Sequence, residues 1–191
     1  MNRSCSALLL AALLLAAFGR TAVAAGVADE LAVRNHITCY PFGIDQIGRG
    51  DFDAGLAIWK QCFSGDYRFT VNVGRGDTVC PGDACPFPKE MSTVEMRANF
   101  ARKAFQASGF VRTSHHITNV RVAFPDKSHA TVNAYIQAWH VKADGSILAA
   151  PGTWDLGLVK RQGKWWIATE KLTIVMAGVL QSPAPPPAAN H

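Results

Sequence analysis

RTSHHITNVRVAFPDKSHATVNAYIQAWHV, residues 112–141, is the stretch that decides the fold. Apolar and polar residues alternate along both of its halves, which is the pattern of β-strands that bury one face. The halves are separated by Pro125-Asp126-Lys127-Ser128, a sequence suited to a tight turn, because proline restricts φ and Asp and Ser bond to their own backbone. The stretch therefore predicts an antiparallel hairpin.

The two faces of this hairpin differ in character. In the first strand Val120, Val122 and Phe124 alternate with His115, Ile117, Asn119 and Arg121. Pairing Phe124 with Ala130 places four hydrogen-bonding side chains on one face. These are His115, Asn119, Tyr135 and Gln137. That polar face either lines a pocket or meets solvent, and the function depends on which.

The first 24 residues predict a secretory signal peptide. Arg3 supplies a positive start, residues 7–18 form an apolar run too short to span a bilayer, and Ala22-Val23-Ala24 is a small-x-small cleavage site. Cleavage after Ala24 would place the mature protein in the periplasm or outside the cell, with no membrane segment remaining. The alternative is that this run is a buried first helix.

Four cysteines remain after such cleavage, namely Cys39, Cys62, Cys80 and Cys85. An even number in an exported chain favours disulfides. The closeness of Cys80 to Cys85 suggests a local pair, which leaves Cys39 to bridge Cys62. A metal site is the alternative, but no Cys-x-x-Cys spacing is present. His36, His129 and His140 also lack a metal-ligand spacing. The sequence therefore predicts two disulfides and no metal.

Charge excludes one class of partner. The net charge is +5 at pH 7 with neutral histidines, and the basic residues are scattered along the chain. Nucleic-acid-binding proteins instead gather Lys and Arg on one face. We expect no nucleic-acid partner.

Before the hairpin the chain is mainly helical. Asp29 and Glu30 favour a helix start, and the apolar spacing extends a helix over 27–47 that Pro41 should kink or split. Asp51 is expected to cap a second helix over 52–62. A strand is predicted over 66–73.

A long connection, 74–89, holds Cys80 and Cys85 and is a candidate lid or binding loop. Ser92 and Glu95 form a capping box that starts a third helix, which should run to Ser108 and end at Gly109.

After the hairpin, strands are predicted over 147–159 and 164–175, with Asp155 and Glu170 pointing outward. Residues 182–191 are rich in Pro and Ala and are expected to be disordered, so the folded domain spans 25–181. Helices first and an antiparallel meander afterwards predict an α+β domain.

Four local motifs in this order resemble the SnoaL-like group of the nuclear transport factor 2-like superfamily. They are Ile44-Asp45 followed by Gly50-Asp51-Phe52-Asp53, then Phe63-Ser64-Gly65-Asp66, then Ser114-His115-His116-Ile117-Thr118-Asn119, and finally Gly163-Lys164-Trp165-Trp166-Ile167-Ala168. The resemblance covers residues 29–175. It implies a cystatin-like α+β roll, in which a strongly curved mixed sheet wraps as a cone around about three N-terminal helices and leaves a pocket at its open end.

The same resemblance implies a site. Scytalone dehydratase-like members use an aspartate of the first helix and histidines of the sheet, which correspond here to Asp45 and His115. The second histidine position falls near Tyr135, where tyrosine is a better donor than base at neutral pH. The expected catalytic residues are therefore Asp45, His115 and Tyr135. The expected ligand-binding residues are Tyr40, Asn119, Gln137 and Trp139.

Two hypotheses of function follow. The first is a cofactor-free lyase or isomerase of the dehydratase type, acting by acid/base chemistry on a small apolar, polyketide-like or steroid-like molecule. The second is a non-catalytic ligand-binding or homodimerisation module of the same fold, because the fold alone does not determine chemistry. The two differ in whether Asp45 and His115 meet in an apolar cavity.

Overall fold

The computed structural model describes residues 26–73, 90–175 and 178–180. The predicted signal peptide, the connection containing Cys80 and Cys85, and the Pro/Ala-rich tail lie outside these residues. Within the described parts, no helix combines the length and apolar character needed to cross a membrane.

The helices come first, and the long helix predicted over 27–47 is split in two. A helix over 26–36 is followed by α2 (Cys39–Gly48), then α3 (Phe52–Lys60), and after β1 by α4 (Val94–Ala107). The break falls upstream of Pro41. Pro41 lacks a backbone N–H, and a helix tolerates this only in its first turn, where the N–H groups have no partner within the helix. A new helix, α2, therefore begins at Cys39, two residues before Pro41. At the break, the Tyr40 amide donates to the Ile37 carbonyl at 3.2 Å.

Helix ends follow the local sequence with one difference. The Asp51 side chain accepts from the Ala54 amide at 3.2 Å, as an N-cap should. At α4 the cap is Thr93 and not the predicted Ser92, since the Thr93 hydroxyl accepts from the Met96 amide at 3.1 Å. Gly109 follows the last turn of α4 with φ of 68°, a conformation that glycine adopts without strain.

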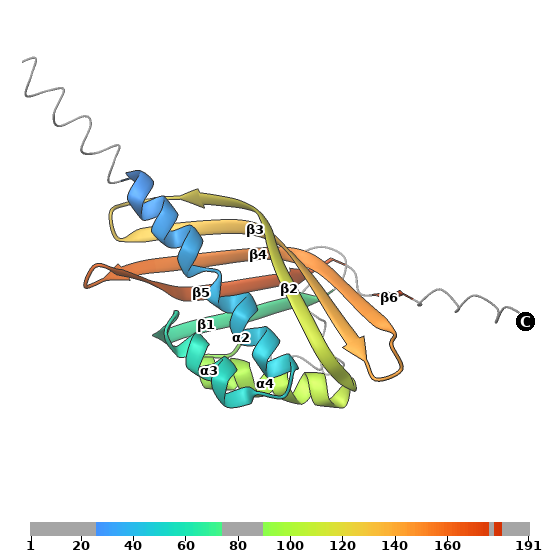
Figure 1. Cartoon of the computed structure of the whole chain (residues 1–191). Helices are drawn as coiled ribbons and strands as arrows, with labels where there is room; N and C mark the ends of the chain where they lie inside the picture. The colour runs from blue at the N-terminus through green and yellow to red at the C-terminus, as the bar shows by residue number, and fades with distance from the viewer. Residues whose placement is uncertain (1–25, 74–89, 176–177, 181–191) are drawn as a thin grey trace, which may run out of the picture.

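The strands form one mixed sheet that curves around the helices (Figure 1). Its order is β1-β5-β4-β3-β2, with β6 beside β4. The bounds are β1 Phe63–Val73, β2 Phe110–Ala123, β3 His129–Lys142, β4 Ile147–Arg161, β5 Lys164–Ile174 and β6 Gly178–Leu180. β1 runs parallel to β5 and the other pairs are antiparallel. This is the cone-shaped α+β architecture that the sequence predicted.

The central hairpin contains a bulge that changes which side chains share a face. Near the turn, Val122 pairs with Val132, in the predicted register, but the pairing shifts by one residue between Thr118 and Arg121. Asn119 lies in this shift with φ of 53°, a left-handed conformation that asparagine tolerates better than most residues. Because strand faces alternate with period two, the shift reverses the inward and outward positions of the rest of β2.

His115 consequently lies on the apolar inner face. It pairs with Ala138, and both residues are buried. Tyr135 and Gln137 lie on the outer face, where Tyr135 is 53% exposed. The predicted polar face that joined His115 to Tyr135 and Gln137 is therefore wrong, since that prediction assumed a regular strand.

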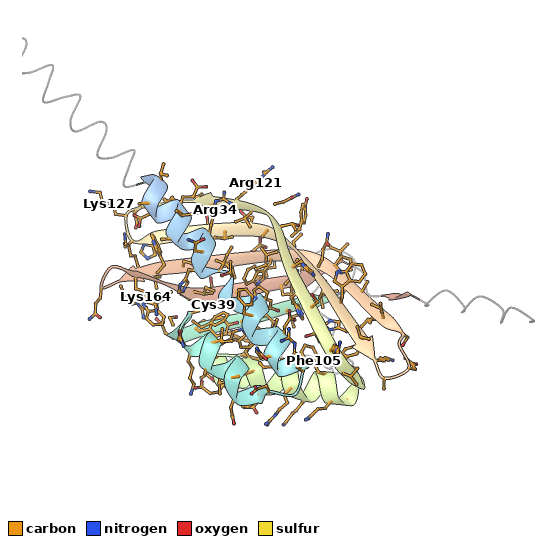
Figure 2. The ribbon with its side chains drawn as sticks, in the orientation of Figure 1. Arg34, Cys39, Phe105, Arg121, Lys127 and Lys164 are labelled. Atoms are coloured by element: carbon orange, nitrogen blue, oxygen red, sulfur yellow. A yellow bond between two sulfur atoms is a disulfide. The ribbon has the colours of Figure 1, made fainter. Side chains whose placement is uncertain are left out.

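The helices pack into the concave side of the sheet and against each other. Gly43 allows α2 and α3 to approach closely, because a Cβ added there would lie 2.2 Å from the Trp59 ring. The predicted disulfide between Cys39 and Cys62 is confirmed and ties the start of α2 to the end of α3 (Figure 2). These contacts fix the position of α2, which carries Tyr40 and Asp45.

Candidate functional site

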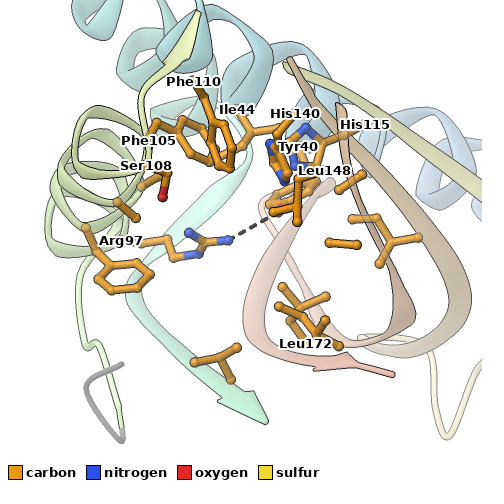
Figure 3. A pocket seen from close by; sticks show the side chains of 18 of the residues that line it. Tyr40, Ile44, Arg97, Phe105, Ser108, Phe110, His115, His140, Leu148 and Leu172 are labelled. Carbon is orange, nitrogen blue, oxygen red and sulfur yellow. Dashed lines mark hydrogen bonds between the residues drawn. The ribbon is translucent and has the colours of Figure 1, made fainter. Parts of the chain in front are cut away.

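A cavity lies between α4, the middle of α2 and the inner face of the sheet, and has a volume of ≈ 340 Å³ (Figure 3). Its wall is mostly aliphatic and aromatic. The residues with polar side-chain atoms among those that line it are Tyr40, Arg97, Ser108, His115 and His140. A concave apolar space with a few convergent polar groups is the usual form of a small-molecule site, and this volume is at the small end of the range.

Asp45 and His115 meet at the wall of this cavity. The Asp45 Oδ1 lies 2.7 Å from His115 Nδ1, and the His115 backbone N–H donates to Asp45 Oδ2 at 3.2 Å. The Thr113 hydroxyl donates to Asp45 Oδ1 at 3.0 Å. Three contacts from one strand thus hold the carboxylate of α2, and the aspartate in turn orients the imidazole.

The hydrogen bond determines which His115 nitrogen is available to a ligand. An ionised carboxylate only accepts hydrogen bonds, so Nδ1 carries the proton and Nε2 is left as an unprotonated acceptor. His115 lines the cavity whereas Asp45 lies behind it, which directs Nε2 away from the carboxylate. Burial lowers the pKa of His115, although Asp45 opposes this effect, so the imidazole is neutral near pH 7. Such a nitrogen is suited to accept a proton.

A second histidine, His140, belongs to the same cavity, and the sequence analysis missed it. Its ring is 5.3 Å from the His115 ring and stacks on Phe110 with ring centroids 4.7 Å apart. Burial, with a further contribution from His115, lowers the pKa of His140 to about 4. The signal was present, because His140 has the parity of the inward residues of β3. It was overlooked because the bulge that brings His115 to that face was not foreseen.

The other predicted site residues divide between the cavity and the outer face. Tyr40 lines the cavity, with its ring 6.0 Å from that of His115 in an edge-to-face arrangement. Four predicted residues are not brought to the cavity, namely Asn119, Tyr135, Gln137 and Trp139. Asn119 and Tyr135 border one shallow depression of the outer surface and Trp139 another. Tyr135 therefore lies on the opposite face of the sheet from His115 and does not share a site with Asp45 and His115.

A buried charge pair was also missed. Glu170 was expected to point outward, but only 2% of it is exposed, and Arg97 of α4 is buried as well. The Arg97 Nη2 lies 4.0 Å from Glu170 Oε1 and donates to the Tyr40 hydroxyl at 3.1 Å. Neither residue has a local sequence signal, because their burial depends on tertiary packing, in which α4 lies against α2, α3, β1 and β2.

Metal chemistry has no evident site in the described part of the chain. His, Cys, Asp and Glu do not gather there in groups of three or more. Around the apolar hollow the structure places an imidazole oriented by Asp45, a second imidazole, a tyrosine hydroxyl and the guanidinium of Arg97.

The fold and the site together define a cone-shaped α+β domain with a ligand cavity at its helical side. The chain belongs to the SnoaL-like domain family, which matches residues 25–171, and so to the nuclear transport factor 2-like superfamily. No curated protein sequence matches it significantly.

Solved structures with a similar fold include one named as a dehydratase and one named as a dehydrochlorinase. A candidate scytalone dehydratase from Novosphingobium aromaticivorans DSM 12444 is 16% identical, with 88% of this chain and 99% of that chain covered and a TM-score of 0.59. The hexachlorocyclohexane dehydrochlorinase LinA-type3 from Novosphingobium barchaimii LL02 is 12% identical, with 85% and 98% covered and a TM-score of 0.63. At these identities the likeness establishes the fold alone.

Proposed function

We propose that the protein is an exported, cofactor-free lyase or isomerase that removes a proton from a small, largely apolar molecule held in the cavity. The observation that carries this proposal is the 2.7 Å contact between Asp45 and His115 at the wall of an apolar hollow. The names of the dehydratase and the dehydrochlorinase support it, since both describe loss of a proton together with a leaving group.

In the proposed reaction His115 Nε2 takes a proton from a ligand carbon, and the C–H electron pair moves into the adjacent bond. In an elimination this pair forms a double bond while the leaving group departs with its own bonding pair and then takes up the proton from His115. In an isomerisation the proton returns to another carbon. Asp45 accepts the Nδ1–H throughout and stabilises the imidazolium that forms.

His140 suits this role as a neutral neighbour. A pKa of about 4 keeps it uncharged at neutral pH, so it does not oppose the positive charge that develops on His115. A positive charge 5.3 Å away, ring to ring, would disfavour that proton transfer.

The test is proton exchange on a simple carbon acid. Wild-type protein and His115→Gln are incubated with 1-tetralone in D₂O, and loss of the α-proton signal is followed by NMR. We expect wild-type protein to accelerate exchange and the variant to lose at least about a hundredfold of the acceleration. His116→Gln, an exposed neighbour on the other face of β2, is the matched control. Exchange that His115→Gln leaves unchanged ends the proposal, and binding without exchange favours the non-catalytic alternative.

The outer face of the sheet favours homodimerisation as a second candidate function. Tyr135 and Gln137 are exposed there and Trp139 is half-buried beside them, although β3 is a central strand. Large side chains on an open sheet face are typical of protein contacts. Light scattering should show a dimer for wild-type protein and a monomer for Tyr135→Asp. Monomeric wild-type protein at about 100 μM, well above the Kd of a stable interface, would refute this candidate.

A further inference from the structure

Arg97 is the one buried cation in the wall of the cavity among the described residues. It extends from α4 into the ring of lining side chains, toward Tyr40 of α2 (Figure 3). Its guanidinium lies over the Phe69 ring, 4.0 Å from the centroid, and only 4% of the residue is exposed. A charged group in such a place requires partners, because an ion removed from water loses its hydration.

The side chains around Arg97 satisfy only part of its hydrogen-bond donors. A guanidinium carries five N–H groups. Within the described residues its one hydrogen bond goes to the Tyr40 hydroxyl, its contact with Glu170 is at the long distance of 4.0 Å, and its Nε has no partner. Tyr40 accepts this bond with its oxygen, which leaves its own O–H to donate elsewhere. Two side chains that share a hydrogen bond therefore offer surplus donors beside an apolar hollow.

The charges of Arg97 and Glu170 indicate whether the ligand group that accepts from Arg97 is neutral or anionic. Glu170 accepts from the Tyr67 hydroxyl and from the Trp154 indole at 2.9 Å behind the cavity wall. Burial raises the pKa of Glu170, but Arg97 and these two donors oppose that rise and favour the carboxylate, whose charge balances that of Arg97. An anionic ligand would add a second buried negative charge to a pair that is already balanced, and burial of unbalanced charge is costly. A neutral oxygen needs no such balance.

We propose that Arg97 and the Tyr40 hydroxyl bind the carbonyl oxygen of the ligand, so that the ligands are ketones, esters or lactones on an apolar ring body. This rests on the proposed function in so far as the cavity is the ligand site. The positions agree, because Tyr40 lies between Arg97, at 3.1 Å, and the His115 ring, at 6.0 Å. A carbonyl oxygen on Tyr40 puts the neighbouring carbon on the His115 side, where a base is required. Burial raises the pKa of Tyr40, which keeps its hydroxyl protonated and able to donate.

The experiment compares three probes of similar size with the full chain by isothermal titration. The probes are 1-tetralone, the hydrocarbon tetralin and the anion 1-naphthoate. Wild-type protein should bind the ketone about tenfold or more tighter than the hydrocarbon, as expected for hydrogen bonds that involve a charged donor, and bind the carboxylate least.

Two variants isolate the role of Arg97. Arg97→Met/Glu170→Gln removes both charges together, so that neither is left unpaired, and should lose the preference for the ketone while tetralin binding stays within about twofold. Glu170→Gln alone leaves Arg97 uncompensated and should raise naphthoate affinity by about tenfold. Circular dichroism reports whether the double variant folds. If it does not, Tyr40→Phe replaces it as the test, because this variant keeps the ring, removes one donor and should lower the ketone-to-hydrocarbon affinity ratio.

The outcomes separate this inference from the proposed function. An unchanged ketone-to-hydrocarbon ratio in the double variant, or in Tyr40→Phe if only that variant folds, overturns the inference. So does tighter binding of naphthoate than of tetralone by wild-type protein, or no measurable binding of tetralone. His115→Gln should keep the wild-type ratio while it loses proton exchange. Ketone binding through Arg97 without exchange in wild-type protein would refute the chemistry and leave the ligand class standing.

Discussion

His140→Phe should make the protein less sensitive to acid. His140 is 7% exposed, stacks on Phe110 and touches the Phe105 ring at a centroid distance of 5.3 Å. Its Nδ1 has no hydrogen-bond partner among the described residues. Phenylalanine preserves the aromatic packing and removes both the unsatisfied nitrogen and the titration.

The magnitude follows from proton linkage. The pKa of His140 is about 4 in the folded protein, because burial disfavours the imidazolium, whereas an unfolded histidine has a pKa of about 6.5. Between these values the unfolded chain binds a proton that the folded protein does not. Stability is therefore greatest above about pH 6.5 and falls as the pH falls toward 4. For this one residue the loss at pH 5 is about 2 kcal/mol.

Urea denaturation at pH 7.5 and pH 5.0 measures the effect. The free energy of unfolding of His140→Phe should fall by about 2 kcal/mol less than that of wild-type protein between the two pH values. The contributions of groups that do not interact with His140 cancel in this difference. If His140→Phe and wild-type protein lose the same stability, the reasoning about His140 is wrong.

Three further predictions concern the pair, the bulge and the disulfide. Asp45→Asn should retain 1-tetralone binding but reduce its proton exchange by about a hundredfold or more, because the amide cannot hold His115 Nδ1–H as the carboxylate does; equal exchange rates by NMR would contradict this. Asn119→Val should lower the free energy of unfolding by about 1–2 kcal/mol, since a β-branched residue is strained at φ of 53°, whereas Asn119→Gly should be nearly neutral; equal effects of the two substitutions on urea denaturation would refute the role of the bulge. Replacing both Cys39 and Cys62 by serine opens a loop with a sequence separation of 23 and should cost about 3 kcal/mol in the same assay; a loss below about 1 kcal/mol would show that the disulfide contributes little.

The parts of the structure that the sequence predicted share a local cause. The caps at Asp51 and Gly109 and the break near Pro41 depend on residues a few positions apart. The alternation that marked residues 112–141 is likewise a local property, so the hairpin and the α+β class could be derived without coordinates.

The candidate site was predicted only in part, for reasons that lie in longer-range contacts. Asp45 and His115 came from a motif resemblance, and the structure brings them together. Tyr135 was assigned to the site from the second histidine position of the resemblance. Asn119, Gln137 and Trp139 were assigned from an ideal strand parity, which the bulge reversed for His115. His140 was absent from the prediction for the same reason.

The sequence by itself determined the order of the helices and main strands, their approximate ends and the apolar face of β3, because these depend on backbone preferences and spacing within a few residues. The tertiary structure alone decided that His115 and His140 face one cavity, and that Glu170 is buried with Arg97. A one-residue shift in β2 and the packing of α4 against α2, α3, β1 and β2 bring together groups far apart in the chain. No local pattern encodes that proximity, since it arises from the closure of a curved sheet around the helices.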